Sequence, residues 1–262
     1  MTSSGVPVLG RWGMGTRSGL LSGRVALVTG ASSGLGGRFA RVLREAGADV
    51  VVTARRADRL EQLAGELEAV AVAGDIASPA HRQALAAAVA ERFGQLDILV
   101  NNAGVCDDGP LEDQSLSELE TVVQVNLIAV LDLCRLMAPL LFTSEYASVI
   151  NIASIYGLVT SRAPMAAYNS TKAALVGLTR HLAAQWGPRR VRVNALAPGY
   201  FATELTGMLA DPGFVAEIGS QTLLGRAPSI EELDGPLLFL ASDASSYVTG
   251  HTLVVDGGWT CT

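Results

Sequence analysis

The chain alternates short apolar runs, rich in β-branched residues, with longer stretches of helical periodicity. The strand-like runs cover residues 24–30, 49–54, 70–75, 96–104, 147–154, 192–199 and 252–258. The helical stretches between them cover residues 35–47, 58–69, 79–93, 116–142, 165–186 and 230–240. Successive strands joined by helices lie parallel, because each helix returns the chain to the same end of the sheet. The alternation therefore predicts α/β architecture: one doubly wound domain with a parallel sheet of about seven strands and helices on both faces.

No linker or internal repeat interrupts this alternation, so residues 23–262 are predicted to form a single domain. Residues 1–22 are rich in Gly and Ser and contain two arginines, but they lack the continuous apolar segment of a secretory signal. We expect a flexible leader there.

The composition narrows the functional classes. Hydrophobic residues make up 49% of the 262 residues and charged residues 17%, which is enough for a large core. The net charge of −6 and the lack of a basic stripe argue against nucleic acid as a partner. No apolar run is expected to reach the length of a membrane span. The three cysteines and three histidines are scattered outside metal or disulfide spacings, which favours a cytoplasmic protein without a structural metal.

The segment “TGASSGLG” at 29–36, between the first strand and its helix, indicates a phosphate-binding turn. Glycine allows the backbone to turn sharply and approach a pyrophosphate, and the N–H groups of the following helix face the anion. The spacing G-x-x-x-G-x-G differs from the standard fingerprint, and a glycine-rich turn without a ligand is the alternative. We interpret it as a Rossmann-type dinucleotide site. The residues expected to line it are Gly30, Ser32, Ser33, Gly34, Leu35 and Gly36.

The end of the second strand should discriminate between cofactors. An acidic residue there favours NAD, whereas an arginine accommodates the 2′-phosphate of NADP. Ala54 occupies the expected acidic position and is followed by Arg55 and Arg56, whose guanidinium groups suit a phosphate monoester. NADP(H) is therefore favoured over NAD(H); two solvated charges ahead of a helix are the alternative. The residues expected to border the adenosine follow the third and fourth strands: Asp75, Ile76 and Asn102.

Lys172 is the only lysine in a chain with 18 arginines, and it lies four residues after Tyr168. On the helix expected over 165–186 the two side chains share one face. The reference pKa of tyrosine is about 10, and a neighbouring ammonium lowers it by favouring the phenolate. A compact ammonium suits this role, and contact with a ribose hydroxyl, better than a planar guanidinium. The pair is interpreted as a general acid/base with its tuning amine; a chance pairing is the alternative.

Four motifs in this order resemble those of the short-chain dehydrogenase/reductase family: “TGASSGLG”, “NNAG” (101–104), “YNSTK” (168–172) and “PGYFAT” (198–203). The resemblance is to the single-domain subtype of about 250 residues, and it runs from about residue 22 to the C-terminus. Among the members of this family, the sequence most resembles the 3-oxoacyl-reductase-like and gluconate-dehydrogenase-like ones. The resemblance implies a Rossmann-type fold and an NAD(P)-dependent oxidoreductase.

The resemblance also implies residue roles. Tyr168 would exchange a proton with the substrate oxygen, and Lys172 would hold the nicotinamide ribose. Ser154 would hydrogen-bond the substrate oxygen, and Asn126 would support a water-linked proton relay. Ser154 lies 14 residues before Tyr168, one more than is usual, so we infer a one-residue insertion in the loop and take Ser161 as the alternative hydroxyl. The implied cofactor contacts are Asn102, Ala103, Gly104, Tyr168, Lys172, Pro198, Gly199 and Thr203.

These features predict hydride transfer between the nicotinamide and a carbonyl or secondary alcohol, with the protein supplying orientation and the proton path. The alternatives are an NAD-preferring sugar or polyol dehydrogenase of the same family, a cofactor-binding sensor without turnover, and an epimerase or dehydratase of the wider superfamily.

The substrate pocket should be walled by residues 105–110, 155–162 and 200–225. Tyr156, Tyr200 and Met208 indicate a partly apolar wall, and the lack of arginine between Tyr200 and Arg226 disfavours a strongly anionic small-molecule substrate. The segment between Tyr200 and Gly225 is expected to close as a lid. The family resemblance implies a homotetramer that packs the long helices at 116–142 and 165–186 between subunits, with Trp259 near an interface.

Overall fold

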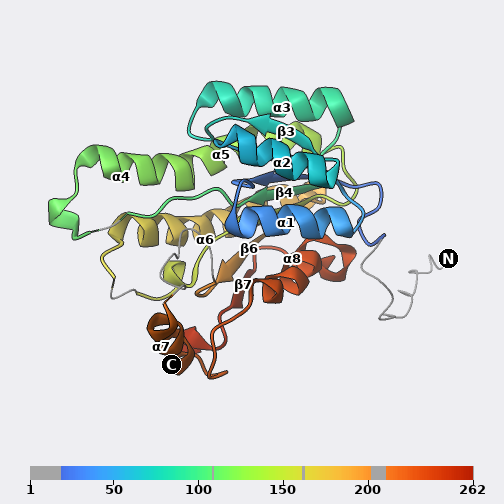
Figure 1. Cartoon of the computed structure of the whole chain (residues 1–262). Coiled ribbons are helices and arrows are strands. Elements are labelled where there is room, and N and C mark those ends of the chain that lie inside the picture. The colour runs from blue at the N-terminus through green and yellow to red at the C-terminus, as the bar shows by residue number, and fades with distance from the viewer. Residues whose placement is uncertain (1–18, 108, 161–162, 202–210, 262) are drawn as a thin grey trace.

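The computed structural model describes residues 19–107, 109–160, 163–201 and 211–261. Seven parallel strands form one sheet in the order β3-β2-β1-β4-β5-β6-β7 (Figure 1). Their bounds are β1 (Val25–Thr29), β2 (Asp49–Ala54), β3 (Val70–Ala73), β4 (Ile98–Asn101), β5 (Ser148–Ile152), β6 (Arg192–Pro198) and β7 (Thr252–Val255). The order reverses between β1 and β4, and ligands of doubly wound folds bind at the carboxyl edge of such a switch point.

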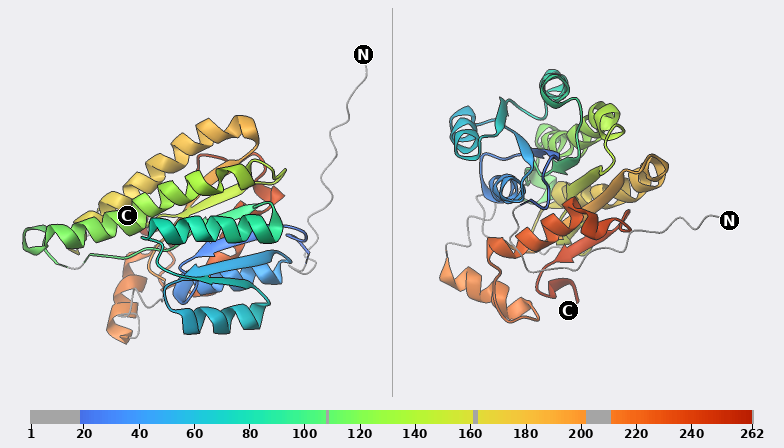
Figure 2. Two further views of the ribbon diagram at one scale, coloured as in Figure 1. Left: turned by 90° about the horizontal axis from the view of Figure 1, so that it is seen from above. Right: turned by 90° about the vertical axis from the view of Figure 1, so that its right-hand side faces the viewer.

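Eight α-helices are described: α1 (Gly34–Glu45), α2 (Ala57–Leu67), α3 (Pro79–Phe93), α4 (Leu116–Val123), α5 (Ala129–Leu141), α6 (Ala166–Trp186), α7 (Pro212–Gln221) and α8 (Asp234–Ala241). Buried residues of α1, α2 and α8 pack on one face of the sheet, and those of α3, α5 and α6 pack on the other. The two helix layers are seen on either side of the sheet in Figure 2 (right). The predicted doubly wound parallel architecture is therefore confirmed.

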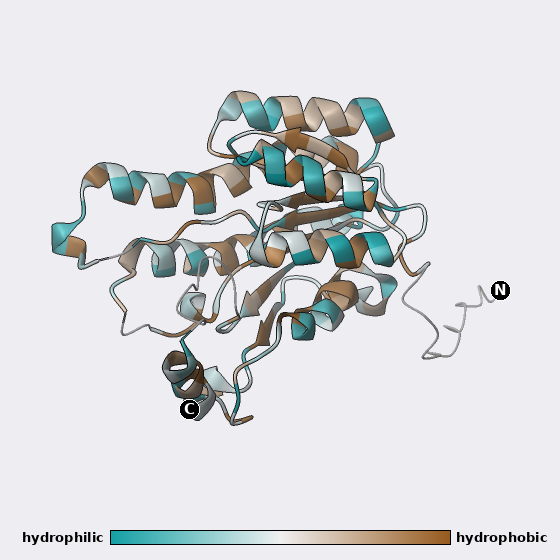
Figure 3. Cartoon of the chain, in the orientation of Figure 1, coloured by the Kyte–Doolittle hydropathy of each residue, from teal (hydrophilic) through white to brown (hydrophobic). Residues whose placement is uncertain are grey.

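Strands β1, β4 and β5 are buried on both faces, and this is why they read as continuous apolar runs rather than as alternating ones. Along β1, Ala26 and Val28 join the cluster beneath α1, while Val25 and Leu27 join the cluster beneath α3 and α5. In Figure 3 the strands are mostly brown, and the outward faces of α1, α2 and α3 carry the teal of charged residues. Because successive side chains of a strand point to opposite faces of the sheet, the sheet contributes to two hydrophobic cores, one on each face.

The long helical region predicted over residues 116–142 is divided in two. A π-helical turn, Gln124–Ile128, separates α4 from α5. A π turn inserts one extra residue, and such turns are frequent at functional sites. Asn126 lies within it and is fully buried.

The run Leu116–Leu141 is long and apolar enough to cross a membrane by composition, although 39% of its most apolar window is buried inside the protein. This differs from the sequence expectation that no apolar run reaches the length of a membrane span. Four apolar side chains along it remain exposed: Leu116, Val123, Ile128 and Leu131. We call these four the α4–α5 apolar stripe. It is an apolar surface of the single chain that needs an explanation.

At the start of the described chain, Leu21 is fully buried in the core beneath α1, and its backbone N–H donates to the Ala46 carbonyl at 2.8 Å. Packing against the domain therefore begins at least two residues before the boundary expected at residue 23. The leader itself lies, apart from residues 19–22, outside the described residues and stays a prediction.

Candidate active site

A cavity of about 850 Å³ opens at the carboxyl ends of the central strands. Its walls include every predicted cofactor-binding residue except Thr203, which lies outside the described residues. The predicted residues in the wall are Gly30, Ser32, Ser33, Gly34, Leu35, Gly36, Arg55, Arg56, Asp75, Ile76, Asn102, Ala103, Gly104, Tyr168, Lys172, Pro198 and Gly199. Segments up to about 170 residues apart in the chain therefore meet in one site, as parallel strand ends require.

The glycine-rich turn has no room for side chains at two of its positions. A Cβ on Gly30 would lie 2.9 Å from the Ala103 Cα, and Gly30 has a φ of +70°. A Cβ on Gly36 would lie 2.3 Å from the Gly30 carbonyl oxygen and 2.5 Å from the Asn102 amide nitrogen. The turn is therefore closed tightly on itself and on the “NNAG” segment, which leaves the start of α1 facing the cavity. This cradle fits a pyrophosphate at a helix N-terminus.

Thr29 fastens the “NNAG” turn to the end of β1. Its hydroxyl accepts the backbone N–H groups of Asn102 and Ala103, both at 2.9 Å, and its carbonyl accepts the Asn102 side-chain amide at 2.8 Å. Sequence reasoning found Asn102 and missed Thr29. The only available signal was its position directly before Gly30 at the end of a strand.

Arg56 turns back toward the glycine-rich loop. Its Nη2 donates to the Ser33 hydroxyl at 2.6 Å, and both Nε and Nη2 lie 3.2 Å from the Ser32 hydroxyl. Arg55 beside it is exposed, and Ala54 is almost fully buried. Two guanidinium groups thus border the cavity at the end of β2, with no carboxylate at the position of Ala54. Asp75 is exposed at the end of β3, and its carboxylate accepts the Ala77 N–H at 2.9 Å.

The predicted reactive groups come together at the other end of this cavity. Tyr168 lies in the first turn of α6, and the Ser154 side chain, just after the end of β5, is close enough to lower the pKa of its phenol. Lys172 follows one turn later; it is 4% exposed, its Nζ donates to the Ile152 carbonyl at 2.8 Å, and it lies 5.4 Å from the centre of the Tyr168 ring. The expectation of a shared helix face is confirmed for this pair.

Asn126 lies behind the cavity wall. Its Oδ1 accepts the Val105 N–H at 2.9 Å, and its Nδ2 donates to the Val105 carbonyl at 2.8 Å and to the Thr171 hydroxyl at 3.1 Å. A Cβ on Gly104 would meet both Asn126 Oδ1, at 3.4 Å, and Lys172 Nζ, at 3.5 Å, so both groups border the same space beside Gly104. The structure therefore brings Asn126 near Lys172 without a direct hydrogen bond between them in the described contacts.

Burial dominates the acid–base properties of the pair. It raises the pKa of Tyr168 to about 12, while the Ser154 hydrogen bond opposes this increase and the nearby Cys106 and Tyr156 add to it. It lowers the pKa of Lys172 to about 8. The sequence expectation, in which the ammonium lowers the phenol pKa, differs from this result. The main reason is burial, which disfavours the charged phenolate; in addition, the ammonium hydrogen-bonds the Ile152 carbonyl.

Aromatic side chains gather beside Tyr168. The Tyr156 and Tyr200 hydroxyls are 2.6 Å apart, and the Tyr200 ring packs against Phe214 and Trp259 with centroid distances of 5.9 and 5.1 Å. Trp259 is therefore half-buried within its own chain, and its expected place near a subunit interface stays a prediction. Met208, Ser161 and residues 202–210 of the expected lid lie outside the described residues.

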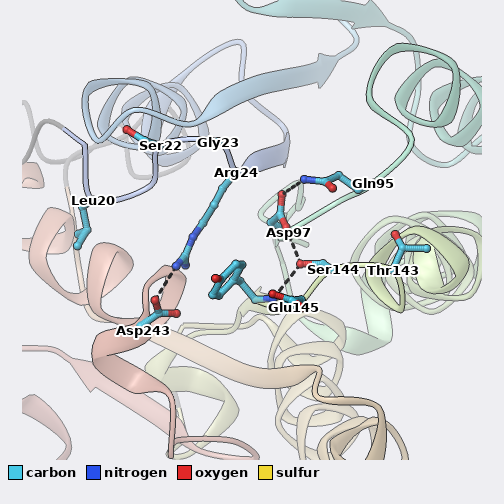
Figure 4. Close-up of a pocket in the computed structure, with 11 residues that line it drawn as sticks. Leu20, Ser22, Gly23, Arg24, Gln95, Asp97, Thr143, Ser144, Glu145 and Asp243 are labelled. Atoms are coloured by element: carbon cyan, nitrogen blue, oxygen red, sulfur yellow. Dashed lines mark hydrogen bonds and ion pairs between the residues drawn. The ribbon is translucent and has the colours of Figure 1, made fainter. Parts of the chain in front are cut away.

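A second cavity, of about 410 Å³, lies at the opposite, amino-terminal edge of the sheet (Figure 4). Arg24 crosses it and pairs with Asp243 at 2.8 Å. Asp97, only 2% exposed, accepts hydrogen bonds from the Val25 N–H at 2.7 Å and from the side chains of Gln95 and Ser144. Both charged side chains already have partners within the chain, so we interpret the cavity as holding structural interactions.

Comparison with known proteins identifies relatives over nearly the whole chain. Residues 30–260 match the family model described as enoyl-(acyl carrier protein) reductase. The chain is 38% identical to gluconate 5-dehydrogenase of Gluconobacter oxydans (strain 621H) over 246 residues, which cover 92% of this chain and 96% of the relative. It is also 38% identical over 248 residues to the rhamnolipids biosynthesis 3-oxoacyl-[acyl-carrier-protein] reductase of Pseudomonas aeruginosa, covering 91% and 97%.

A solved structure with the same fold is the gluconate 5-dehydrogenase from Burkholderia cenocepacia J2315 in complex with NADP and tartrate. The two structures superpose with a TM-score of 0.87 at 36% sequence identity, over 92% of this chain and 97% of the other. The cavity described above thus belongs to a fold that accommodates a nicotinamide dinucleotide in a related protein.

Proposed function

Because the chain belongs to the short-chain dehydrogenase/reductase family of NAD(P)-dependent oxidoreductases, we propose that it interconverts a carbonyl and a secondary alcohol with NADP(H), with Tyr168 as the general acid/base. The observation that carries this proposal is that Tyr168 and Lys172 both lie in the wall of the cavity formed by the glycine-rich turn, with the Ser154 side chain acting on the Tyr168 phenol. A hydroxyl donor, a phenol and an amine are the groups needed to polarise and protonate a carbonyl oxygen.

The proton chemistry follows from the pKa values. With a pKa of about 12, Tyr168 is protonated at neutral pH and is in the form that donates a proton to a carbonyl oxygen during reduction. Ser154 orients the phenol and polarises the same oxygen. Lys172, with a pKa of about 8, retains its proton at neutral pH and favours the phenolate left after transfer. The nicotinamide, when bound, supplies or accepts the hydride.

Asn126 and Thr171 complete the support of this site. Asn126 joins the Val105 backbone to Thr171, and the Thr171 hydroxyl donates to the Tyr168 carbonyl at 2.8 Å. Through Gly104, Asn126 also lies close to Lys172. We assign Asn126 to the route by which the lysine regains a proton from water, which is compatible with its position behind the cavity wall.

The preference for NADP(H) over NAD(H) rests on the end of β2. Ala54 leaves no carboxylate to bind the ribose 2′-hydroxyl, and Arg56 lies across Ser32 and Ser33 beside the expected phosphate position. Arg55 adds a second guanidinium. The NADP complex of the Burkholderia relative supports the same assignment. The alternative is an NAD-preferring sugar or polyol dehydrogenase. The similarity to gluconate 5-dehydrogenase supports this alternative.

The assembly and location of the protein are also proposals. The α4–α5 apolar stripe, Leu116, Val123, Ile128 and Leu131, would be covered by the same helices of another subunit in a homotetramer. Such burial would explain an exposed apolar surface without invoking a membrane. We place the assembled enzyme in the cytoplasm. Its proposed partner is a small-molecule carbonyl or alcohol, and no nucleic acid is expected to bind. We take residues 23–262 as the catalytic domain.

A substrate panel tests the proposal. Ketones, sugars and secondary alcohols would be assayed by nicotinamide absorbance with NADPH/NADP and NADH/NAD in parallel. We expect Tyr168→Phe to bind cofactor normally but to lose roughly 10²–10⁴ of the turnover number on any substrate found. Wild-type kcat in this variant would refute the assignment of Tyr168. A cofactor-binding sensor without catalysis would instead bind cofactor and show no turnover with any compound.

A substitution that removes the positive charge of Arg56 tests the cofactor preference. We expect Arg56→Gln to weaken NADPH binding by roughly 10- to 100-fold and to leave NADH binding within about twofold, because only NADPH presents a phosphate to that guanidinium. Equal losses for the two cofactors would favour the NAD-preferring alternative.

A further inference from the structure

The helix that carries Tyr168 begins without a cap of its own. The N-cap residue of α6 is Met165, which makes no side-chain hydrogen bond to the helix. The first N–H groups of any helix lack partners inside it, so they need acceptors from elsewhere. Tyr168 is the third residue of α6, so its own backbone N–H is one of these groups.

Asp107 supplies the missing acceptors from a distant segment. Its Oδ2 accepts the Ala167 N–H at 3.0 Å, and its Oδ1 accepts the Tyr168 N–H at 2.8 Å, across separations of 60 and 61 residues. Asp107 is only 6% exposed. Both oxygens of a buried carboxylate therefore bind two successive N–H groups where the helix dipole is positive, an arrangement normally made by a local N-cap side chain.

The segment that presents Asp107 is itself held in place. Two residues earlier, the Val105 backbone forms hydrogen bonds of 2.9 and 2.8 Å with Asn126. On the other side, the Gln114 amide donates to the Gly109 carbonyl at 2.8 Å and lies 3.4 Å from Asp107 Oδ2. Asp107 thus connects the “NNAG” segment, which lines the cofactor cavity, directly to the first turn of α6.

We infer that Asp107 is a positioning residue for catalysis: it holds the first turn of α6 so that the Tyr168 phenol stays at Ser154 and faces the cofactor cavity. The inference rests on the proposed function, because it acts through Tyr168. Ordinary helix caps stabilise a helix wherever they occur, whereas this one binds the backbone of the acid/base residue itself. Displacement of a reacting group by about 1 Å lowers rates by roughly 10²-fold.

The test is a pair of substitutions at Asp107. We expect Asp107→Ala to lower kcat by roughly 10²-fold while the substrate KM and the cofactor Kd stay within about twofold of wild type. Asp107→Asn keeps one acceptor oxygen, so kcat should recover to within about tenfold of wild type. Rates would be expressed per cofactor-binding site and measured well below the melting temperature of each variant.

Ser115→Ala is the matched control. Ser115 caps α4 through a capping box with Glu118, away from Tyr168. We expect it to lower the melting temperature about as much as Asp107→Ala does and to leave kcat unchanged, because it also removes one helix cap. If Asp107→Ala behaves in the same way, with lower stability but wild-type kcat, Asp107 is only a structural cap and the inference fails.

Tyr168→Phe separates this inference from the proposed function. Turnover in Tyr168→Phe would overturn the proposed function, and the role of Asp107 with it. An inactive Tyr168→Phe together with a fully active Asp107→Ala would overturn the inference alone. Should Asp107→Ala fail to fold, Asp107→Asn carries the test, and a kcat equal to that of wild type would contradict a positioning role.

Discussion

The two ends of the sheet hold their buried cations in opposite ways. At the amino-terminal end, Arg24 is 8% exposed, pairs with Asp243, donates to the Ala241 carbonyl and lies over the Tyr146 ring. At the carboxyl end, Lys172 is 4% exposed and hydrogen-bonds the Ile152 carbonyl, and no described ion pair neutralises it. Burial then lowers the pKa of Lys172 to about 8. The cation at the amino-terminal end is neutralised, whereas the amine beside the proposed acid/base Tyr168 is buried without a described counter-charge, which costs energy.

The largest effect is expected when each buried cation is replaced by the type found at the other end of the sheet. We expect Lys172→Arg to reduce kcat by roughly 10²- to 10³-fold, because a guanidinium neither fits the site of a compact ammonium nor titrates near pH 8. The mirror substitution, Arg24→Lys, should leave kcat unchanged and lower the free energy of unfolding by about 1 kcal/mol. Steady-state kinetics and urea unfolding measure the two effects. An Arg24→Lys enzyme with impaired kcat would mean that the amino-terminal network reaches the active site.

Removing the charge of Asp97, at the amino-terminal end, should affect the stability of the protein and not its turnover. Asp97 accepts three hydrogen bonds while it is nearly inaccessible to solvent. We expect Asp97→Asn to lower the free energy of unfolding by about 3 kcal/mol, because buried donors lose an ionised acceptor. Denaturant unfolding would report the loss, and kcat of the folded fraction should not change. A stability equal to that of wild type would show that these bonds contribute little.

The pH dependence of stability gives the smallest of the three effects. The pKa of Lys172 is about 8 in the folded chain and about 10.4 in an unfolded one, so the unfolded chain binds more protons between these values. The free energy of unfolding should therefore rise by about 2 kcal/mol from pH 8 to pH 10 relative to Lys172→Met. Tyr168 contributes in the opposite direction only above pH 10, since its folded pKa is about 12. Parallel pH profiles for the two proteins would contradict the depressed pKa of the lysine.

Much of the fold could be predicted from the sequence, because hydrophobic periodicity and turn residues act locally. The helix at 79–93 was predicted with the bounds of α3, since Ser78 caps it and Pro79 begins it. The pairing of Tyr168 with Lys172 followed from a helical spacing of four. The π turn at Asn126 escaped prediction because one extra residue in a helix hardly changes the apolar pattern.

The parts of the site that were not predicted depend on contacts distant in sequence. Nothing in the segment around Asp107 indicates a helix cap, since the helix begins about 60 residues later. The orientation of Arg56 toward Ser32 and Ser33 depends on how β1 and β2 align in the sheet. The pKa of Tyr168 depends on burial and on Ser154, and sequence spacing to Lys172 describes neither.

The burial of the chain's one lysine has a practical consequence. A protease that cleaves only after lysine has a single possible target within the sequence, and that target lies inside α6. Cleavage there requires this helix to unwind and expose residues that are now packed behind the cavity wall. The rate at which such a protease cuts the chain would therefore report the opening of the catalytic helix, and a bound dinucleotide that contacts α6 should slow the cut.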